Sequence, residues 1–436
     1  MASPTCRPSL PYHRTTETDI ITSTKALQSL IKSSHFDQAL SLFRRILSLY
    51  KPDPFCLPLA LKACANLPSP LSGRALHALA LKSALRPNPF VACALLDFYA
   101  KSSSSPVSAL SVFDEIPNPN LVTYNALLSC HVRLGRVDDA LDLFRCMHVK
   151  HNTSSYNTII AGMSRAGRHA HALEFVRQMC TAGERPNLIT LLNVLPACAS
   201  LAAPHTVREA HAYAARASLY WNAQLGSALV EAYGRCGCLH YARQVFDSMP
   251  VRDVVAWSAL ISAHALHGEA KNALLIFDQM VKGGVRPDGL ALLAVLKACS
   301  HGGLVDEALR FVREMEVMYG LEVGVEHGAC VVDVLGRAGR LGEAVEVAKV
   351  MGEGAGAKVW GAVLAACRVH GEVGVAEEAW GKLRELEGWN AGNYVLMASV
   401  YAGAGRHEDA ERVRGDMREK GVRSFPGCSW VEEVSG

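Results

Sequence analysis

The sequence predicts an all-α protein, a right-handed α-solenoid of tandem helix-turn-helix repeats. A glycine is followed five residues later by an alanine eight times, and apolar residues recur at helical spacing on both sides of each glycine. Successive glycines lie 32, 70, 31, 35, 36, 32 and 34 residues apart, and the interval of 70 holds two units. A period in the thirties is typical of a solenoid, in which each unit buries its apolar face only against its neighbours. The pairs are Gly135/Ala140, Gly167/Ala172, Gly237/Ala242, Gly268/Ala273, Gly303/Ala308, Gly339/Ala344, Gly371/Ala376 and Gly405/Ala410.

Residues 254–288 show the helical hairpin of one unit most clearly. Its first apolar stripe starts at Val254 and Trp257, and its second contains Ala273, Phe277 and Met280. Gly268 supplies the backbone freedom needed to end one helix and turn into the next. Pro287 then ends the second helix, because proline disfavours helical geometry in the residue before it.

The same template fills the chain with twelve hairpins, or about 24 helices. The first three are weaker, because Ser34/Ala39, Pro68/Gly73 and Ser104/Ala109 replace the usual pair. Residues 102–105 are four serines, which we interpret as a loosened turn between helices rather than a linker. The units span residues 20–53, 54–88, 89–120, 121–152, 153–187, 188–222, 223–253, 254–288, 289–324, 325–357, 358–391 and 392–431.

Composition restricts the class of protein without naming a ligand. Half of the 436 residues are apolar, but no uninterrupted apolar run approaches the roughly 18 residues of a membrane span, so we expect no membrane association. The net charge of +3 is compatible with nucleic-acid binding but does not favour it.

The 14 cysteines favour packing rather than metal binding. Cys64, Cys198, Cys299 and Cys367 lie in the similar strings LKACA, LPACA, LKACS and LAACR, where a small apolar side chain packs at one repeated helical position. No Cys-x-x-Cys pair is present. We therefore expect reduced thiols and no metal site.

The N-terminal residues 1–19 have the composition of an organellar transit peptide. They contain Arg7, His13 and Arg14 with several Ser and Thr, their first acidic residue is Glu17, and they lack the apolar centre of a secretory signal. The alternative is a disordered tail of a cytosolic protein.

Two strings, YNALLSCHVRLGRVDDALDLFRCM and YNTIIAGMSRAGRHAHALEFVRQM, resemble pentatricopeptide repeats. The Trp, Leu-Gly and Tyr pattern of tetratricopeptide repeats is absent, although the resemblance implies the same TPR-like hairpin fold. Units of 35 residues alternate with units carrying the AC string and with short units ending in FDSMPVRD or FDEIPNPN, which is similar to the PLS class of plant members. The resemblance implies an array of about ten repeats over residues 20–357.

Residues 358–431 are similar to the paired E1 and E2 motifs that close editing-type members of this family, and residues 432–436 form a tail. Members with their own cytidine deaminase continue into a zinc domain carrying His-x-Glu and Pro-Cys-x-x-Cys, and we expect none here. His267-Gly-Glu269 and His370-Gly-Glu372 spell His-x-Glu but span hinge glycines, and GEGAGA at 352–357 is interpreted as a flexible connector. Without a nucleophile and base constellation we expect no enzyme, catalytic residue or cofactor.

The resemblance assigns base recognition to a residue early in the first helix and to the last residue of the unit. An ionised Asp only accepts hydrogen bonds and suits the N1–H and N2–H of guanine, whereas Asn both donates and accepts. By the family's code the Thr/Asp and Ser/Asp pairs favour G, and the Asn/Asn pairs favour C, with U second. The alternative for any single residue is an exposed polar side chain or a helix cap. The pairs are Thr24 with Asp53, Asn125 with Asn152, Asn157 with Asn187, Ser227 with Asp253, and Ser258 with Asp288.

These pairs predict a strand with G, two unassigned bases, two pyrimidines, one unassigned base and G-G. Three bases stay unassigned because the early-helix residue of their unit does not fit the family's code. Cys93 is one such residue, and Pro58 and Leu192 have no side-chain group that forms hydrogen bonds. The resemblance implies a site-recognition factor for organellar C-to-U RNA editing. It would bind single-stranded organellar RNA in the mitochondrion, or alternatively the chloroplast, and recruit a deaminase in trans with other editing factors. The alternatives are an RNA-binding factor for splicing, stability or translation, and a protein-binding scaffold.

Overall fold

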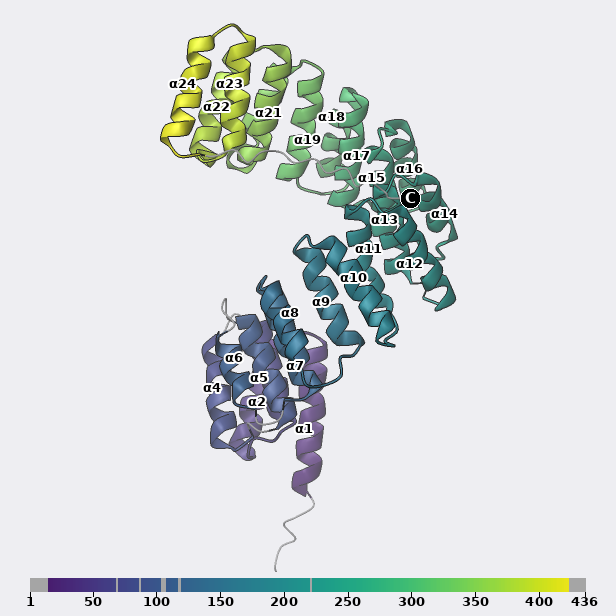
Figure 1. The fold of residues 1–436 in the computed structure, drawn as a ribbon, viewed down its shortest axis with the longest axis vertical. Coiled ribbons are helices and arrows are strands. Elements are labelled where there is room, and N and C mark those ends of the chain that lie inside the picture. The colour runs from purple at the N-terminus through teal and green to yellow at the C-terminus, as the bar shows by residue number, and fades with distance from the viewer. Residues whose placement is uncertain are drawn as a thin grey trace, which may run out of the picture. The chain divides into compact units, whose positions relative to one another are not determined.

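The computed structural model describes residues 15–67, 70–85, 88–102, 107–116, 119–219 and 222–422, and these ranges contain 24 α-helices, one 3-10 helix and no strand. Figure 1 shows the helices along the chain. The all-α repeat solenoid predicted from the glycine period is therefore confirmed, down to the number of helices. Residues 1–14 of the expected transit segment lie outside the described residues. The same is true of Pro68, Ser104 and the tail at 432–436.

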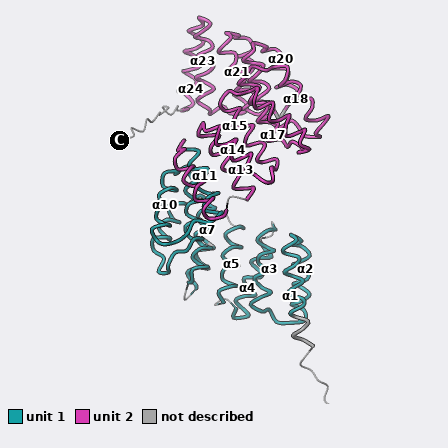
Figure 2. The backbone as a smooth tube through the Cα atoms, turned by 90° about the vertical axis from the view of Figure 1, so that its right-hand side faces the viewer, with its two compact units in different colours: residues 1–201 teal, residues 202–436 magenta. Residues whose placement is uncertain are grey.

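The chain divides into two compact units, residues 1–201 and 202–436 (Figure 2). The helices of the first are α1 (Thr15–Lys32), α2 (Phe36–Leu49), α3 (Cys56–Asn66), α4 (Pro70–Lys82), α5 (Pro89–Ser102), α6 (Val107–Asp114), α7 (Leu121–Arg133), α8 (Val137–Cys146), α9 (Thr153–Arg165), α10 (His169–Thr181) and α11 (Leu188–Ser200).

The helices of the second unit are α12 (Pro204–Arg216), α13 (Ala223–Arg235), α14 (Leu239–Ser248), α15 (Val254–Leu266), α16 (Ala270–Lys282), α17 (Gly289–Gly302), α18 (Val305–Val317), α19 (Val325–Arg337), α20 (Leu341–Val350), α21 (Gly356–His370), α22 (Val373–Glu387), α23 (Ala391–Gly403) and α24 (His407–Glu419). The 3-10 helix η1 (Gly352–Ala355) precedes α21.

Within each unit, the first helices of successive hairpins form a continuous row. In unit 1, α3 packs on α5, α5 on α7, α7 on α9 and α9 on α11, and in unit 2 the same contacts run from α13 to α23 through the odd-numbered helices. Where both helices of a hairpin lie in one unit, the second helix packs against the first, as α16 does on α15. The exposed side of the odd-numbered row is therefore a surface that repeats once per hairpin.

Left-handed backbone geometry at the hinges explains the glycine period. Gly135, Gly268 and Gly371 have φ of +75°, +74° and +73°, a region that residues with a Cβ rarely enter. The paired alanines, such as Ala140 and Ala273, are fully buried where the two helices approach. In each hinge, the glycine thus allows the left-handed turn, and the alanine allows the two helices to approach closely.

The degenerate hinges keep the same geometry without glycine. Ser34 in the first hairpin has φ of +61°, and Ala202, within the 70-residue interval, has φ of +47°. Val207, five residues after Ala202, is fully buried at the position that alanine holds elsewhere. The interval therefore contains two further helices, α11 and α12, in the order that the sequence predicts.

The repeated cysteines pack in the core, as predicted. Cys64 is 1% exposed and Cys198, Cys299 and Cys367 are fully buried. Burial raises the pKa of Cys299 to about 12 and that of Cys367 to about 11, because the protein interior disfavours the thiolate. The cysteines in the described part of the chain are thiols.

The two His-Gly-Glu strings lie at hinges, as predicted, and their histidines join neighbouring repeats. The Nε2 atom of His267 donates to the carbonyl of Gly234 at 2.7 Å, and Nε2 of His370 donates to the carbonyl of Gly336 at 2.8 Å. Both imidazoles therefore satisfy a carbonyl at the end of the preceding first helix.

The segment 352–357 is not the flexible connector expected from its glycines. Gly352–Ala355 forms a 3-10 helix, and α21 begins at Gly356. The methyl group of Ala355 is fully buried, which fixes the segment against α20 and α21. One apolar anchor between glycines is enough to order this short turn.

Candidate nucleic-acid interface

The last residue of each predicted pair caps the first helix of the next hairpin. The Oδ1 atoms of Asn152 and Asn187 accept hydrogen bonds from the backbone N–H groups of Ser155 and Thr190, both at 3.1 Å. The Oδ1 atoms of Asp253 and Asp288 do the same for Ala256 and Ala291, at 2.9 and 2.8 Å. Asp53 accepts from Phe55 and Cys56 at 2.8 and 2.5 Å where α3 begins. Asn and Asp are favoured here because their oxygen satisfies a free N–H group of the first turn.

Capping occupies one polar atom and leaves the other available at the surface. Within the described residues, the Nδ2 atoms of Asn152 and Asn187 donate no hydrogen bond, and the Oδ2 atoms of Asp253 and Asp288 accept none. An Asn cap therefore presents two N–H donors, whereas an Asp cap presents a charged acceptor.

The structure brings both Asn/Asn pairs into direct contact. Nδ2 of Asn125 donates to Oδ1 of Asn152 at 3.3 Å, and Nδ2 of Asn157 donates to Oδ1 of Asn187 at 3.1 Å. Each early-helix amide also accepts from a hydroxyl of the next helix: Ser155 donates to Asn125 at 2.7 Å and Thr190 to Asn157 at 2.6 Å. The two pairs are thus fixed by hydrogen bonds between adjacent first helices.

The pairs with Asp are arranged differently, because their hydroxyls bond elsewhere. The Oγ atoms of Ser227 and Ser258 donate to the carbonyls of Ala223 and Val254, at 3.0 and 2.7 Å. In residues 222–422 no hydrogen bond joins either serine to its Asp partner. Because each serine hydroxyl donates its proton to a backbone carbonyl of its own helix, its oxygen can only accept a hydrogen bond from a ligand. Thr24 lies 3.0 Å from the Cys56 sulfur, measured from Oγ1.

One groove in unit 1 is lined by three of the predicted residues. It has a volume of about 590 Å³ and contains Asn152, Asn157 and Asn187, which come from α9 and the starts of α9 and α11. Two arginines, Arg133 and Arg165, also line it. The groove therefore combines amide donors with positive charge.

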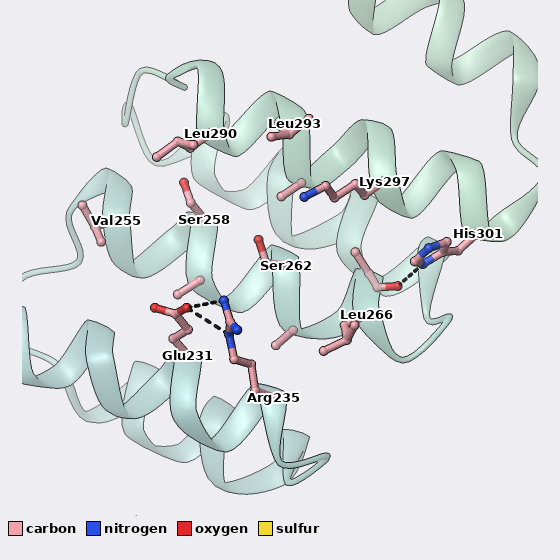
Figure 3. Close-up of a pocket in the computed structure, with 14 residues that line it drawn as sticks. Glu231, Arg235, Val255, Ser258, Ser262, Leu266, Leu290, Leu293, Lys297 and His301 are labelled. Atoms are coloured by element: carbon pink, nitrogen blue, oxygen red, sulfur yellow. Dashed lines mark hydrogen bonds and ion pairs between the residues drawn. The ribbon is translucent and has the colours of Figure 1, made fainter. Parts of the chain in front are cut away.

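A second groove, in unit 2, is more apolar. Its volume is about 460 Å³, and Figure 3 shows Ser258 on α15 between Val255 and the Leu290 and Leu293 side chains of α17. On the α13 side of the groove, Glu231 pairs with Arg235 at 3.0 Å. Apolar walls around one buried hydroxyl fit a flat, partly apolar ligand such as a base.

Exposed apolar residues at one helical position were missed by the sequence reasoning. They stand two residues after the capping Asn or Asp and are 56–68% exposed. Their signal was available, because they fall outside the buried stripe of their own helices. They would offer apolar surfaces for base planes beside each polar pair. They are Phe55, Phe90, Val122, Ile189, Val255 and Leu290.

The last turn of the first helices carries a repeated cation whose pairing differs between repeats. Arg235 and Arg337 bond to Glu231 and Asp333, each at 3.0 Å. Arg133 and Arg165 are exposed, and within residues 119–219 neither has a carboxylate partner. The groove in unit 1 therefore has the less neutralised arginines.

Neither a metal-binding cluster nor a membrane span is found among the described residues. No group of three or more His, Cys, Asp or Glu side chains is placed to hold a metal ion within these ranges. Among the helices described here, none combines the length and apolar character of a membrane span.

Fold and surface define the class: a helical-hairpin repeat protein that presents one polar pair per repeat along a row of first helices. Family models agree with this class. The pentatricopeptide repeat models match residues 117–148, 154–184, 227–254, 255–285 and 292–318, and the E motif matches residues 370–432. This match overlaps the range 358–431 in which the E1 and E2 motifs are expected.

Curated relatives show the family. A pentatricopeptide repeat-containing protein of Arabidopsis thaliana is 46% identical over 417 residues, which cover 95% of this chain and 97% of the relative. A mitochondrial relative from the same plant is 35% identical, covering 93% and 77% of the two chains, and the chloroplastic CRR2 is 34% identical, covering 97% and 60%. The chain belongs to the pentatricopeptide repeat family, and the prediction of a PLS-class member of the E subgroup is confirmed.

Solved structures of the maize pentatricopeptide repeat protein PPR10 are also similar. PPR10 alone and PPR10 in complex with an 18-nucleotide psaJ RNA element are both 16% identical to this chain and match 92% of it. They are covered to 79% and 74%, with TM-scores of 0.38 and 0.49.

Proposed function

We propose that this protein binds single-stranded RNA in a sequence-specific manner through the odd-numbered helices. The observation that carries the proposal is the Asn157–Asn187 pair, held at 3.1 Å in a groove that also contains two arginines without a carboxylate partner in residues 119–219. In helical readers one repeat presents a few side chains to one base of a single strand. A protein-binding groove would not require a polar pair in phase with the repeat.

The capping geometry supports the contrast between the two kinds of pair. An Asn cap with a free Nδ2 donates to the O2 acceptor that cytosine and uracil share. An Asp cap with a free Oδ2, beside a serine that offers only lone pairs, accepts from the N1–H and N2–H of guanine. The proposed target is therefore G, two unassigned bases, two pyrimidines, one unassigned base and G-G, in repeat order.

A gel-shift assay tests the binding and its register. The full chain should retard an RNA with the proposed order, synthesised in both directions, more strongly than one whose G-G is changed to C-C. Equal retardation of the two strands would contradict sequence-specific recognition, and retardation of neither would contradict RNA binding altogether.

We further propose that the protein is a non-catalytic recognition factor for C-to-U editing in an organelle, the mitochondrion or alternatively the chloroplast. The support is the E motif at 370–432 together with relatives whose names are mitochondrial or chloroplastic. The repeats would select the cytidine, and the E motif would recruit a deaminase acting in trans.

Sequencing of all organellar transcripts in plants that lack the protein tests this finer proposal. We expect one or a few cytidines to remain unedited. Complete editing with altered splicing, stability or translation would instead identify the protein as a factor for transcript processing.

A further inference from the structure

The sixth residue of the first helices differs between repeats in a way that the paired positions do not explain. It is alanine in α7, α13, α15 and α17, where it is Ala126, Ala228, Ala259 and Ala294. In α9 it is Thr158 and in α11 it is Asn193, and both line the groove that also contains Asn152, Asn157 and Asn187. In the helix that follows each Asn/Asn pair, a polar side chain therefore replaces alanine, and these are the two pairs for which a pyrimidine is the proposed ligand.

The Asn193 amide is held in one orientation. Its Nδ2 atom donates to the backbone carbonyl of Asn157 at 3.4 Å. A carbonyl can only accept, so the nitrogen must face Asn157 and the Oδ1 atom is the free end. No hydrogen bond to this Oδ1 occurs within residues 119–219, and the side chain is half-buried.

We propose that Asn193 selects cytosine over uracil at the base that faces Asn157 and Asn187, a step that rests on the proposed RNA binding. The free Nδ2 of Asn187 can donate to the O2 of either pyrimidine. The free Oδ1 of Asn193 accepts from the N4 amino group of cytosine, whereas uracil places its O4 acceptor there. A buried acceptor facing another acceptor is disfavoured.

The neighbouring Asn125–Asn152 pair provides an internal comparison. The groove residue that follows it is Thr158, whose hydroxyl donates to the carbonyl of Ser154 at 2.9 Å. That shorter side chain remains close to its own helix, so the first pyrimidine lacks an amide acceptor. The two pairs, identical by the family's code, should discriminate C from U unequally.

Fluorescence anisotropy with the full chain and four synthetic RNAs tests this inference. The RNAs carry C-C, C-U, U-C or U-U at the two pyrimidines of the proposed order and are otherwise identical. For the wild type, U at the base facing Asn157 and Asn187 should weaken binding about fivefold, the factor for one hydrogen bond. U at the other pyrimidine should weaken it less.

Three substitutions make the test specific to the Asn193 side chain. Asn193→Ala should bind C and U about equally at that base, while its discrimination at the first pyrimidine and at G-G stays unchanged. Thr158→Ala should leave the second pyrimidine unaffected. Asn193→Asp, which keeps an acceptor, should retain the preference for C.

The outcomes separate this inference from the proposed function. Retention of the full C preference by Asn193→Ala would overturn the role of Asn193 while leaving RNA binding intact. Equal loss with U at both pyrimidines of the wild type would overturn it as well, even if the variants failed to fold. Absence of wild-type binding to every strand would instead contradict the proposed function.

Discussion

Asp288 illustrates how one side chain serves both fold and surface. Its Oδ1 caps α17 at 2.8 Å from the Ala291 nitrogen, while its Oδ2 has no partner among the described residues. The two roles are compatible because a carboxylate has two oxygens. The contribution of Asp288 to helix capping can therefore be tested separately from the contribution of its charge to the surface.

Asp288→Asn should change base preference without unfolding the protein. Asn is as good a helix cap as Asp, so the free energy of unfolding should change by less than about 0.5 kcal/mol. The exposed acceptor becomes a donor, and preference at that base should shift from G towards A by about 1–3 kcal/mol, by analogy with good base contacts. Thermal denaturation and gel shifts measure the two effects.

Asp288→Ala is the matched control, because it removes both roles. It should lower stability by about 1 kcal/mol through loss of the cap and should also abolish the preference for G. A stable Asp288→Asn protein with unchanged specificity would show that the proposed register is wrong.

Cysteine reactivity should follow burial. Burial raises the pKa of Cys299 to about 12 and that of Cys367 to about 11, so at pH 8 both remain thiols, which are poor nucleophiles. Cys146 and Cys180 are exposed. Iodoacetamide at pH 8 should alkylate the exposed pair first, as detected by peptide mass spectrometry. Equal labelling of all four in the native protein would contradict a packed core.

At the scale of an element, the hinge is determined by backbone geometry rather than by space. A Cβ added to Gly268 would meet no atom within 4 Å, yet its φ is +74°. Gly73 is the opposite case, because there a Cβ would lie 2.1 Å from the Phe98 ring. The two glycines are required for different reasons.

Gly268→Ala should destabilise the protein by about 1–2 kcal/mol, the cost of placing a Cβ in left-handed geometry. Gly381→Ala is a suitable control, because Gly381 is exposed within α22 and a Cβ there also meets nothing within 4 Å. That change should stabilise by about 0.5–1 kcal/mol. Chemical denaturation distinguishes them, and equal effects would contradict a conformational role for Gly268.

Hairpin elements could be placed from the sequence because their signals are local. Gly268 and Ala273 lie five residues apart, and the φ of the one and the burial of the other follow from a single turn. GEGAGA misled the prediction because its order depends on Ala355 packing against separate helices. Tertiary contact overrides local flexibility there.

At the scale of the whole molecule, the net charge of +3 is too small to account for nucleic-acid binding by itself. The arrangement of charge matters more. Arg133 and Arg165 line the groove in unit 1 without carboxylate partners in residues 119–219, whereas Arg235 in unit 2 bonds to Glu231 at 3.0 Å.

Salt dependence should reflect this difference. If Arg165 contacts phosphate, Arg165→Gln should reduce the slope of log affinity against log salt by about 0.7, the value for one contact to a single strand. Arg235→Gln should change it less, because that cation is already neutralised by Glu231. Anisotropy titrations at several salt concentrations measure both slopes, and equal changes would contradict the distinction.

The sequence by itself determined the repeat, the hinges, the buried cysteines and the positions of the paired polar residues. Each of these follows from side chains within one turn or one hairpin, where spacing along the chain fixes spacing in the fold. Only the tertiary structure decided what those polar residues do to one another. The hydrogen bonds from Asn157 to Asn187 and from Asn193 to Asn157 join residues 30 and 36 positions apart. Such contacts depend on how one hairpin packs on the next, and that packing also selects which amide atoms stay free for a ligand.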